Sequence, residues 1–259
     1  MTRRLGRLWF CLPWLASACG GGATAPTPPG PSAAGAARVL VVTHTDGFRH
    51  SSIPVAETTI EQLGRTSGLY STTFCRTADD VRRMLTPAAL GPIDAVVFAN
   101  TTGHLGVPDL AGFLDWIAAG HGFGGIHSAL DTYRDAPAYL DMVGNEFETH
   151  GEQVEVDAVV ESAGHPAVVH LGARYRVFDE IYRFVRNNRG AVTPLLTLDR
   201  FPRDGLPRAG EPADLPLAWA KSHGAGRVFY TALGHRDELW RDAAYQQHVL
   251  GGIRSVLGR

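Results

Sequence analysis

The chain has 259 residues and a formal net charge of −2 at neutral pH, and 44% of its residues are hydrophobic. This length suits one α/β domain with a full core. The near-neutral charge excludes the strongly basic surface of a typical nucleic-acid-binding domain, so we expect no nucleic-acid partner.

The N-terminus has the pattern of an export signal. Three arginines precede a short apolar stretch at 8–18, which is too short to span a bilayer as a mature helix. Cys19 follows Leu15-Ala16-Ser17-Ala18, which resembles a bacterial lipoprotein signal with its leucine displaced by one residue. We predict a signal peptide over 1–18 and lipidation of Cys19, with an ordinary secretory signal as the alternative. The protein is then exported to the cell envelope, and the lipid is its one membrane contact.

Residues 19–37 consist mainly of Gly, Ala, Pro, Thr and Ser, which suits a flexible tether. The folded domain is predicted over 38–259. Its first half alternates buried β-branched runs with amphipathic segments, the pattern of right-handed βαβ units around a parallel sheet. We predict strands at 39–42, 69–75, 93–98 and 123–126, and helices from 51 or 52 to 65, at 77–85 and at 108–120.

The second half is richer in strands. A loop is predicted at 200–214, where Pro, Gly and charged residues gather, and a closing helix at 241–257. Strands are predicted at 153–160, 180–185, 192–198, 217–221 and 228–233. The fold class is therefore α/β.

Three segments that follow the predicted strands carry polar side chains: 43–50, 100–103 and the turn at His127. In parallel sheets, ligands bind at the carboxyl ends of the strands. We expect these three segments to converge on one rim.

His127 stands where an α/β enzyme usually places its nucleophile. The run Gly122-Phe123-Gly124-Gly125-Ile126-His127-Ser128-Ala129 predicts a strand that turns sharply into a helix, as in a nucleophile elbow. An imidazole there can move a proton or bind a metal. A hydrogen-bonded turn histidine is the plainer interpretation.

Several runs resemble the ThuA-like (trehalose-utilisation) family, collinearly from Arg38 to near the C-terminus. They are Thr45-Asp46-Gly47-Phe48-Arg49-His50, Phe98-Ala99-Asn100-Thr101-Thr102-Gly103, Gly124 to Thr132, Asp179-Glu180-Ile181-Tyr182 and Gly226 to His235. The resemblance implies a flavodoxin-like or class I glutamine amidotransferase-like fold, with a mainly parallel sheet and helices on both faces. It also implies a link to disaccharide, especially trehalose, utilisation.

Class I glutamine amidotransferases place a cysteine at the elbow and a histidine after a late strand, followed by a carboxylate. Here His127 takes the cysteine's place and His235 the late histidine's, with Asp237 and Glu238 close behind. The resemblance therefore argues against glutaminase activity and pairs His127 with His235. Cys75, the one cysteine of the domain, has no elbow around it and suits a buried strand position.

The candidate catalytic residues are His127, His235, Asp46 and Asp131, and the candidate substrate-binding residues are His50, Thr101, Thr102, Glu180 and Tyr182. Asp131 lies four residues after His127 and would share its face on a helix. Each has a structural alternative: a turn for Asp46 and the threonines, a helix start for His50, and a cap for Asp131. Trp219 and Trp240 are considered for stacking on a sugar or for packing.

Three functional hypotheses follow. The first is an exported enzyme of disaccharide or keto-sugar utilisation, in which His127 acts as base or acid and His235 as its partner. The second is a divalent metal centre, for which no short-spaced ligand motif is present. The third is a non-catalytic module that binds a small carbohydrate on the cell surface. Cofactor, substrate, reaction and oligomeric state stay open.

Overall fold

The computed structural model describes residues 35–259, which form one compact unit from Ala36 onward. The predicted signal, Cys19 and all but the end of the tether lie outside these residues. Within residues 35–259, no helix is both long and apolar enough to cross a membrane.

Five parallel strands form one half of a nine-stranded sheet, in the order β2-β1-β3-β4-β11. The first four positions of this order are those of a flavodoxin-like sheet. Four of these strands are short, largely apolar runs, as expected where both faces are covered, whereas the edge strand β2 is half polar and partly exposed. The strands are β1 (Ala37–Val42), β2 (Tyr70–Cys75), β3 (Ala95–Ala99), β4 (Gly122–Ile126) and β11 (Gly226–Thr231).

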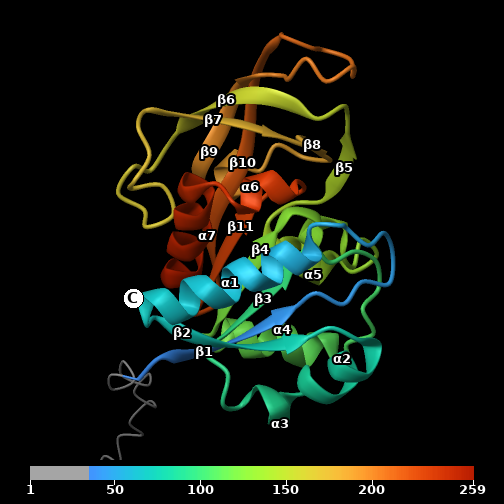
Figure 1. Cartoon of the computed structure of the whole chain (residues 1–259). Helices are drawn as coiled ribbons and strands as arrows, with labels where there is room; N and C mark the ends of the chain where they lie inside the picture. The colour runs from blue at the N-terminus through green and yellow to red at the C-terminus, as the bar shows by residue number, and fades with distance from the viewer. Residues whose placement is uncertain (1–34) are drawn as a thin grey trace, which may run out of the picture. The chain divides into compact units, whose positions relative to one another are not determined.

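Helices cover both faces of this parallel half (Figure 1). One hydrophobic layer holds α1 (Ile53–Ser67), α6 (Asp237–Trp240) and α7 (Ala243–Val256) against the sheet. The other holds α2 (Ala78–Met84), α3 (Pro87–Leu90), α4 (Leu110–Ala118) and α5 (Pro137–Val143). The strands feed both layers, since Val39 and Val41 enter the first and Leu40 and Val42 the second. The predicted fold class is confirmed.

The other half of the sheet is antiparallel and continues in the order β11-β10-β9-β6-β7. Its strands are β6 (Val154–Val160), β7 (Arg174–Asp179), β9 (Thr193–Arg200) and β10 (Pro212–His223). A separate two-stranded sheet pairs β5 (Phe147–His150) with β8 (Tyr182–Phe184). β5 and β7 were not predicted, and the loop at 200–214 is shorter than predicted because β9 and β10 enter it. The strand predicted at 180–185 is present as the shorter β8, so Glu180 lies before it, in the connection that follows β7.

Two helix starts differ from the prediction. Ser52 occupies the N-cap position of α1 but makes no capping hydrogen bond; its hydroxyl instead lies 3.4 Å from the Gly234 carbonyl and accepts from the Asn100 amide. The segment after β4 is the short 3₁₀ helix η1 (His127–Asp131) rather than an α-helix. Its tighter winding means that Asp131 does not share a face with His127.

Candidate functional site

The three polar segments predicted to share a rim are hydrogen-bonded to one another. The backbone N–H of Asp46 donates to the Thr102 carbonyl (3.0 Å), and the N–H of Gly103 donates to the Asp131 carbonyl (2.9 Å). The loops after β1 and β3 and the η1 turn therefore form one surface at the carboxyl ends of the strands. A fourth segment, after β11, joins them through Gly234, whose carbonyl accepts from the Asn100 amide (3.0 Å).

His127 lies at the centre of this surface and is held firmly. Its backbone has φ +52°, in the left-handed region that non-glycine residues rarely occupy. The Tyr230 hydroxyl donates to its carbonyl (2.7 Å), and the ring Nδ1 lies 2.8 Å from the Ala232 carbonyl. Nδ1 therefore carries the proton, and the lone pair of Nε2 points away from Ala232. The side chain has no exposed surface.

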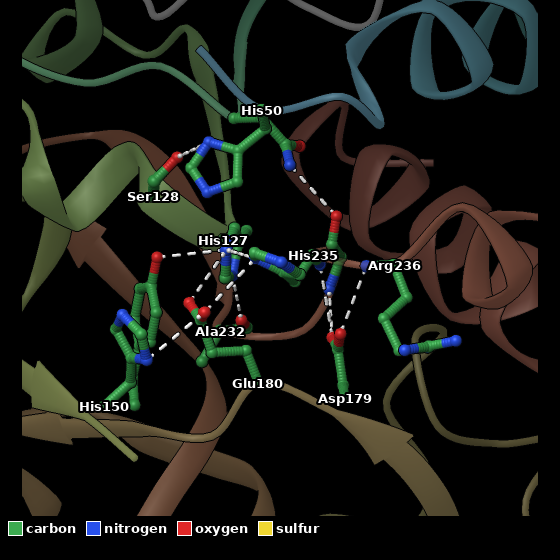
Figure 2. A network of polar contacts seen from close by, with 12 residues as sticks. His50, His127, Ser128, His150, Asp179, Glu180, Ala232, His235 and Arg236 are labelled. Atoms are coloured by element: carbon green, nitrogen blue, oxygen red, sulfur yellow. Dashed lines mark hydrogen bonds and ion pairs between the residues drawn. The ribbon is translucent and has the colours of Figure 1, made fainter. Parts of the chain in front are cut away.

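His235 and Glu180 meet Nε2 of His127 (Figure 2). His235 Nδ1 lies 3.3 Å from His127 Nε2, and Glu180 Oε1 lies 3.5 Å from the same nitrogen. The other carboxylate oxygen, Glu180 Oε2, lies 3.4 Å from His235 Nδ1. The Tyr182 hydroxyl also donates to His127 Nε2 (3.0 Å). Two imidazoles distant along the chain thus share one carboxylate.

Asp179 fixes the loop that carries His235. Its buried carboxylate accepts from the backbone N–H groups of Gly234 (2.7 Å), His235 (3.3 Å) and Arg236 (3.2 Å), as Figure 2 shows. Gly234 has φ +128°, which only glycine adopts readily, so the chain turns sharply just before the imidazole. Asp179 thus holds the backbone of His235, and the adjacent Glu180 contacts the His235 ring.

His50 completes the cluster from the loop after β1. Its ring centroid lies 4.8 Å from that of His127 and 5.2 Å from that of His235, edge to face in both cases. Its Nδ1 lies 3.4 Å from the Ser128 hydroxyl. His50, His127, Glu180 and His235 each offer one donor atom, and these atoms lie within 4.8 Å of one another. We call these four residues the His₃Glu cluster; they are the residues that could hold a metal ion.

Burial and the Glu180 carboxylate shift the pKa values of the three histidines in opposite directions. Burial lowers the pKa of His50 to about 4 and holds the pKa of His127 well below its usual value. The hydrogen bond to Glu180 raises the pKa of His235. Burial also raises the pKa of Asp179 to about 6. At neutral pH His50 and His127 are therefore neutral imidazoles with free lone pairs.

A pocket of about 320 Å³ opens above the cluster. Glu180, His50 and His235 form part of its lining, whereas His127 lies beneath it. The remaining lining residues are Phe48, Thr102, Ser128, Asp131, Phe147, His150 and Tyr182. This volume is at the small end of the range for ligand pockets and suits a single sugar ring.

Five predicted residues lie outside the cluster, and one of them, Tyr182, contacts His127 directly. Thr102 and Asp131 line the pocket; the Thr102 hydroxyl donates to the Phe48 carbonyl (2.7 Å), and Asp131 pairs with Arg134 (3.5 Å). Burial raises the pKa of Asp131. Thr101 is buried and its hydroxyl pairs with that of Thr132 (2.8 Å). Asp46 is exposed in its turn.

His150 was not among the predicted site residues, yet it reaches the site from β5. Its Nδ1 lies 3.2 Å from Glu180 Oε2, so one carboxylate oxygen contacts both His150 and His235. No local motif marks His150, and its position arises from the pairing of β5 with β8. Trp219 and Trp240, considered for stacking, are fully buried and pack in the core. Cys75 is a buried free thiol.

The comparisons with solved structures agree with this fold. A ThuA-like protein from Bacteroides uniformis ATCC 8492 is 19% identical, covers 89% of this chain and 95% of its own, and superimposes with a TM-score of 0.67. One from Parabacteroides merdae ATCC 43184 is 18% identical, with coverage of 86% and 91% and a TM-score of 0.69. A cytoplasmic protein from Salmonella typhimurium LT2 is 13% identical, with coverage of 85% and 99% and a TM-score of 0.59.

Among curated protein sequences, no significant match was found. The family model for ThuA, described as trehalose utilisation, matches residues 38–255, which is nearly the whole of the folded unit. That match includes each loop that carries the His₃Glu cluster. The chain therefore belongs to the ThuA family.

Proposed function

We propose that this protein is an exported, lipid-anchored enzyme of carbohydrate utilisation that acts on one sugar ring in the pocket above the His₃Glu cluster. One observation carries the proposal: three imidazoles and a carboxylate converge at the floor of an open pocket. Structural histidines usually find separate partners, whereas here they gather where a ligand can enter. The trehalose-utilisation family supplies the substrate class.

The walls of the pocket suit a sugar. Phe48 and Phe147 offer apolar surface to a ring face, and Asp131, His150 and Glu180 contribute polar groups to the lining. Phe48 is 67% exposed, and its carbonyl is tied to the Thr45 and Thr102 hydroxyls, which fixes the loop that presents the ring. A disaccharide or its keto derivative would place one ring here and leave the other outside.

The reaction class is proton transfer beside a carbonyl of an oxidised sugar, leading to elimination, hydration or isomerisation. His150 is 44% exposed, lines the pocket and is oriented by Glu180, so it is placed to remove the carbon-bound proton. His235 faces the pocket, and the hydrogen bond to Glu180 raises its pKa, so it then stabilises the negative charge that develops on the carbonyl oxygen. Because His127 has no exposed surface, we assign it a positioning role beneath these groups.

The test is a time course followed by NMR, with trehalose and a keto-oxidised disaccharide as probes. We expect turnover of the keto-oxidised disaccharide but not of trehalose, which has no carbonyl, and a loss of about 100-fold or more in kcat for Glu180→Gln and His150→Gln. His170→Gln is the matched control, because His170 bonds to the Ala244 carbonyl and takes no part in the pocket lining. Binding of the keto-oxidised disaccharide without chemical change contradicts the enzyme proposal and leaves a carbohydrate-binding module. Equal activity in Glu180→Gln and wild type also contradicts it.

A further inference from the structure

We infer that the His₃Glu cluster is a binding site for one divalent transition-metal ion, held by His50, His127, His235 and Glu180. The role of the ion in catalysis rests on the proposed function, whereas its binding rests on the geometry of the cluster alone. The ion would be the positive charge at the pocket floor. Two features of that geometry point to a cation: the spacing of the donor atoms and the direction of their lone pairs.

The spacing matches a coordination shell. With metal–ligand bonds of about 2.0–2.1 Å, two ligand atoms of a tetrahedral site lie about 3.3–3.4 Å apart. Three distances in the cluster are close to this value: 3.3 Å from His127 Nε2 to His235 Nδ1, 3.4 Å from His235 Nδ1 to Glu180 Oε2, and 3.5 Å from His127 Nε2 to Glu180 Oε1. The two histidines therefore contact different oxygens of one carboxylate. The fourth donor, an imidazole nitrogen of His50, lies within 4.8 Å of the other three and approaches from the other side of the ring pair.

The outer hydrogen bonds aim the donors inward. His127 Nδ1 donates to the Ala232 carbonyl, which leaves Nε2 unprotonated and facing His235 and Glu180. Ser128 contacts Nδ1 of His50, which leaves its Nε2 for the centre of the cluster. Metal-bound histidines commonly fix their tautomer in this way, through a carbonyl or another outer partner. The Tyr182 hydroxyl now bonds to His127 Nε2, and a cation there would displace it toward the pocket.

The composition of the set selects the class of ion. Neutral imidazoles with one carboxylate suit zinc, cobalt, nickel or iron(II), whereas magnesium, calcium and manganese(II) favour oxygen ligands. One carboxylate leaves a divalent ion with a net positive charge. Since His50, Glu180 and His235 also line the pocket, an open coordination position would face it, which is the arrangement of a catalytic rather than a structural site.

The strained backbone of His127 supports a functional purpose for its placement. A non-glycine residue in the left-handed region is strained and persists where its surroundings over-determine it. Here the strained backbone directs Nε2 toward His235 and Glu180. Without a cation, the same short contacts require a proton on His235 that is shared with Glu180. An experiment must therefore distinguish a bound cation from this shared proton.

The experiment is a titration of the chelator-treated full chain with Zn²⁺ by calorimetry and with Co²⁺ by visible absorption. We expect one ion per chain and the intense absorption of four- or five-coordinate Co²⁺ with nitrogen ligands. Glu180→Gln keeps the shape of the side chain and should weaken binding about 100-fold or more, as should His127→Gln. His170→Gln, on the surface, should bind like wild type. Circular dichroism establishes that each variant is folded.

Binding of Zn²⁺ that is equal in wild type and Glu180→Gln overturns the inference, and so does a Co²⁺ spectrum that stays that of the hydrated ion. Full sugar turnover by protein shown to be free of metal overturns the role of the ion in catalysis and leaves the proposed function standing. One tightly bound ion that depends on the four residues supports the inference even where no sugar is turned over, in which case the proposed function fails alone.

Discussion

At the scale of single residues, the site depends on the restricted orientation of the His127 ring. Its backbone strain, the Tyr230 bond to its carbonyl and the Ala232 bond to its Nδ1 leave one orientation. Glu180 is the second fixed point, because its two oxygens contact three imidazoles. Replacing either residue should therefore disturb the whole cluster, whereas replacing a rim residue should disturb substrate alone.

Phe48 is the rim residue best placed to show this separation. Its exposed ring stands beside His50 with a centroid separation of 4.9 Å. If a sugar ring packs on it, Phe48→Ala should raise KM about 10-fold, or about 1.4 kcal/mol, with kcat little changed. Phe48→Tyr should restore KM, since it keeps the aromatic face. An unchanged KM in Phe48→Ala would place the sugar elsewhere in the pocket.

His248 on α7 should make the stability of the fold sensitive to acid, independently of the site. It is fully buried, its Nδ1 lies 2.9 Å from the Ala167 carbonyl, and burial lowers its pKa to about 4. The unfolded chain, with a pKa near 6.5, binds the proton more tightly, so stability is complete above pH 6.5 and falls as the pH drops toward 4. Between pH 6.5 and a pH below 4, the free energy of unfolding falls by about 3 kcal/mol because of this one group.

Urea unfolding of wild type and His248→Phe at pH 7.5 and pH 4.5 checks this. The variant should lose less stability on acidification than wild type does, because it has no imidazole to protonate. His165→Phe is the comparison, since the pKa of His165 is also lowered by burial but the side chain is only partly buried. Equal acid sensitivity in wild type and His248→Phe would contradict the account.

Residue predictions from the sequence succeeded where a local turn dictates the position. The glycine-rich strand before His127 and the Gly234 turn before His235 are local signals, and the structure brings these two rings together. His150 could not be found in this way. Its contact with Glu180 depends on the register of β5 against β8, in which His150 lies opposite Tyr182. That register is a tertiary property with no sequence motif.

At the scale of elements, the parallel half of the sheet was predictable because both faces are covered and most of its strands are short apolar runs. β7 was not predicted, although its residues alternate between exposed and buried positions. A period-two pattern does not show where one strand ends and the next begins. The chain leaves β7 at Asp179 and enters β8 at Tyr182, and the two-residue connection holds Glu180 at the site.

The contact between α7 and β11 offers a test of the packing. A Cβ added at Gly252 would lie 2.2 Å from the ring of Phe229, which is buried on β11. Gly252→Ala should therefore destabilise the fold by about 1–3 kcal/mol, despite the better helix propensity of alanine. Gly190→Ala is the control, because nothing lies within 4 Å of a Cβ there. Thermal unfolding of both variants decides; an unchanged midpoint for Gly252→Ala contradicts this packing.

At the scale of the whole molecule, a folded unit from Ala36 onward carries the site, and the sequence before it holds the predicted signal and most of the predicted tether. We propose that this segment delivers the unit to the cell envelope. In a bacterial host, the wild-type chain should incorporate labelled palmitate and enter the detergent phase. Cys19→Ser should do neither, while Cys11→Ser, which changes a cysteine inside the predicted signal, should do both. A wild-type protein that is exported but unlabelled would establish the ordinary secretory signal instead.

The most direct test of the account is a crystal structure of the zinc-soaked full chain with an anomalous difference map at the zinc edge. We predict one strong peak about 2.0–2.2 Å from the donor atoms of His50, His127, His235 and Glu180. The contradicting result is a map with no peak among these four side chains while His235 and Glu180 remain hydrogen-bonded directly to each other.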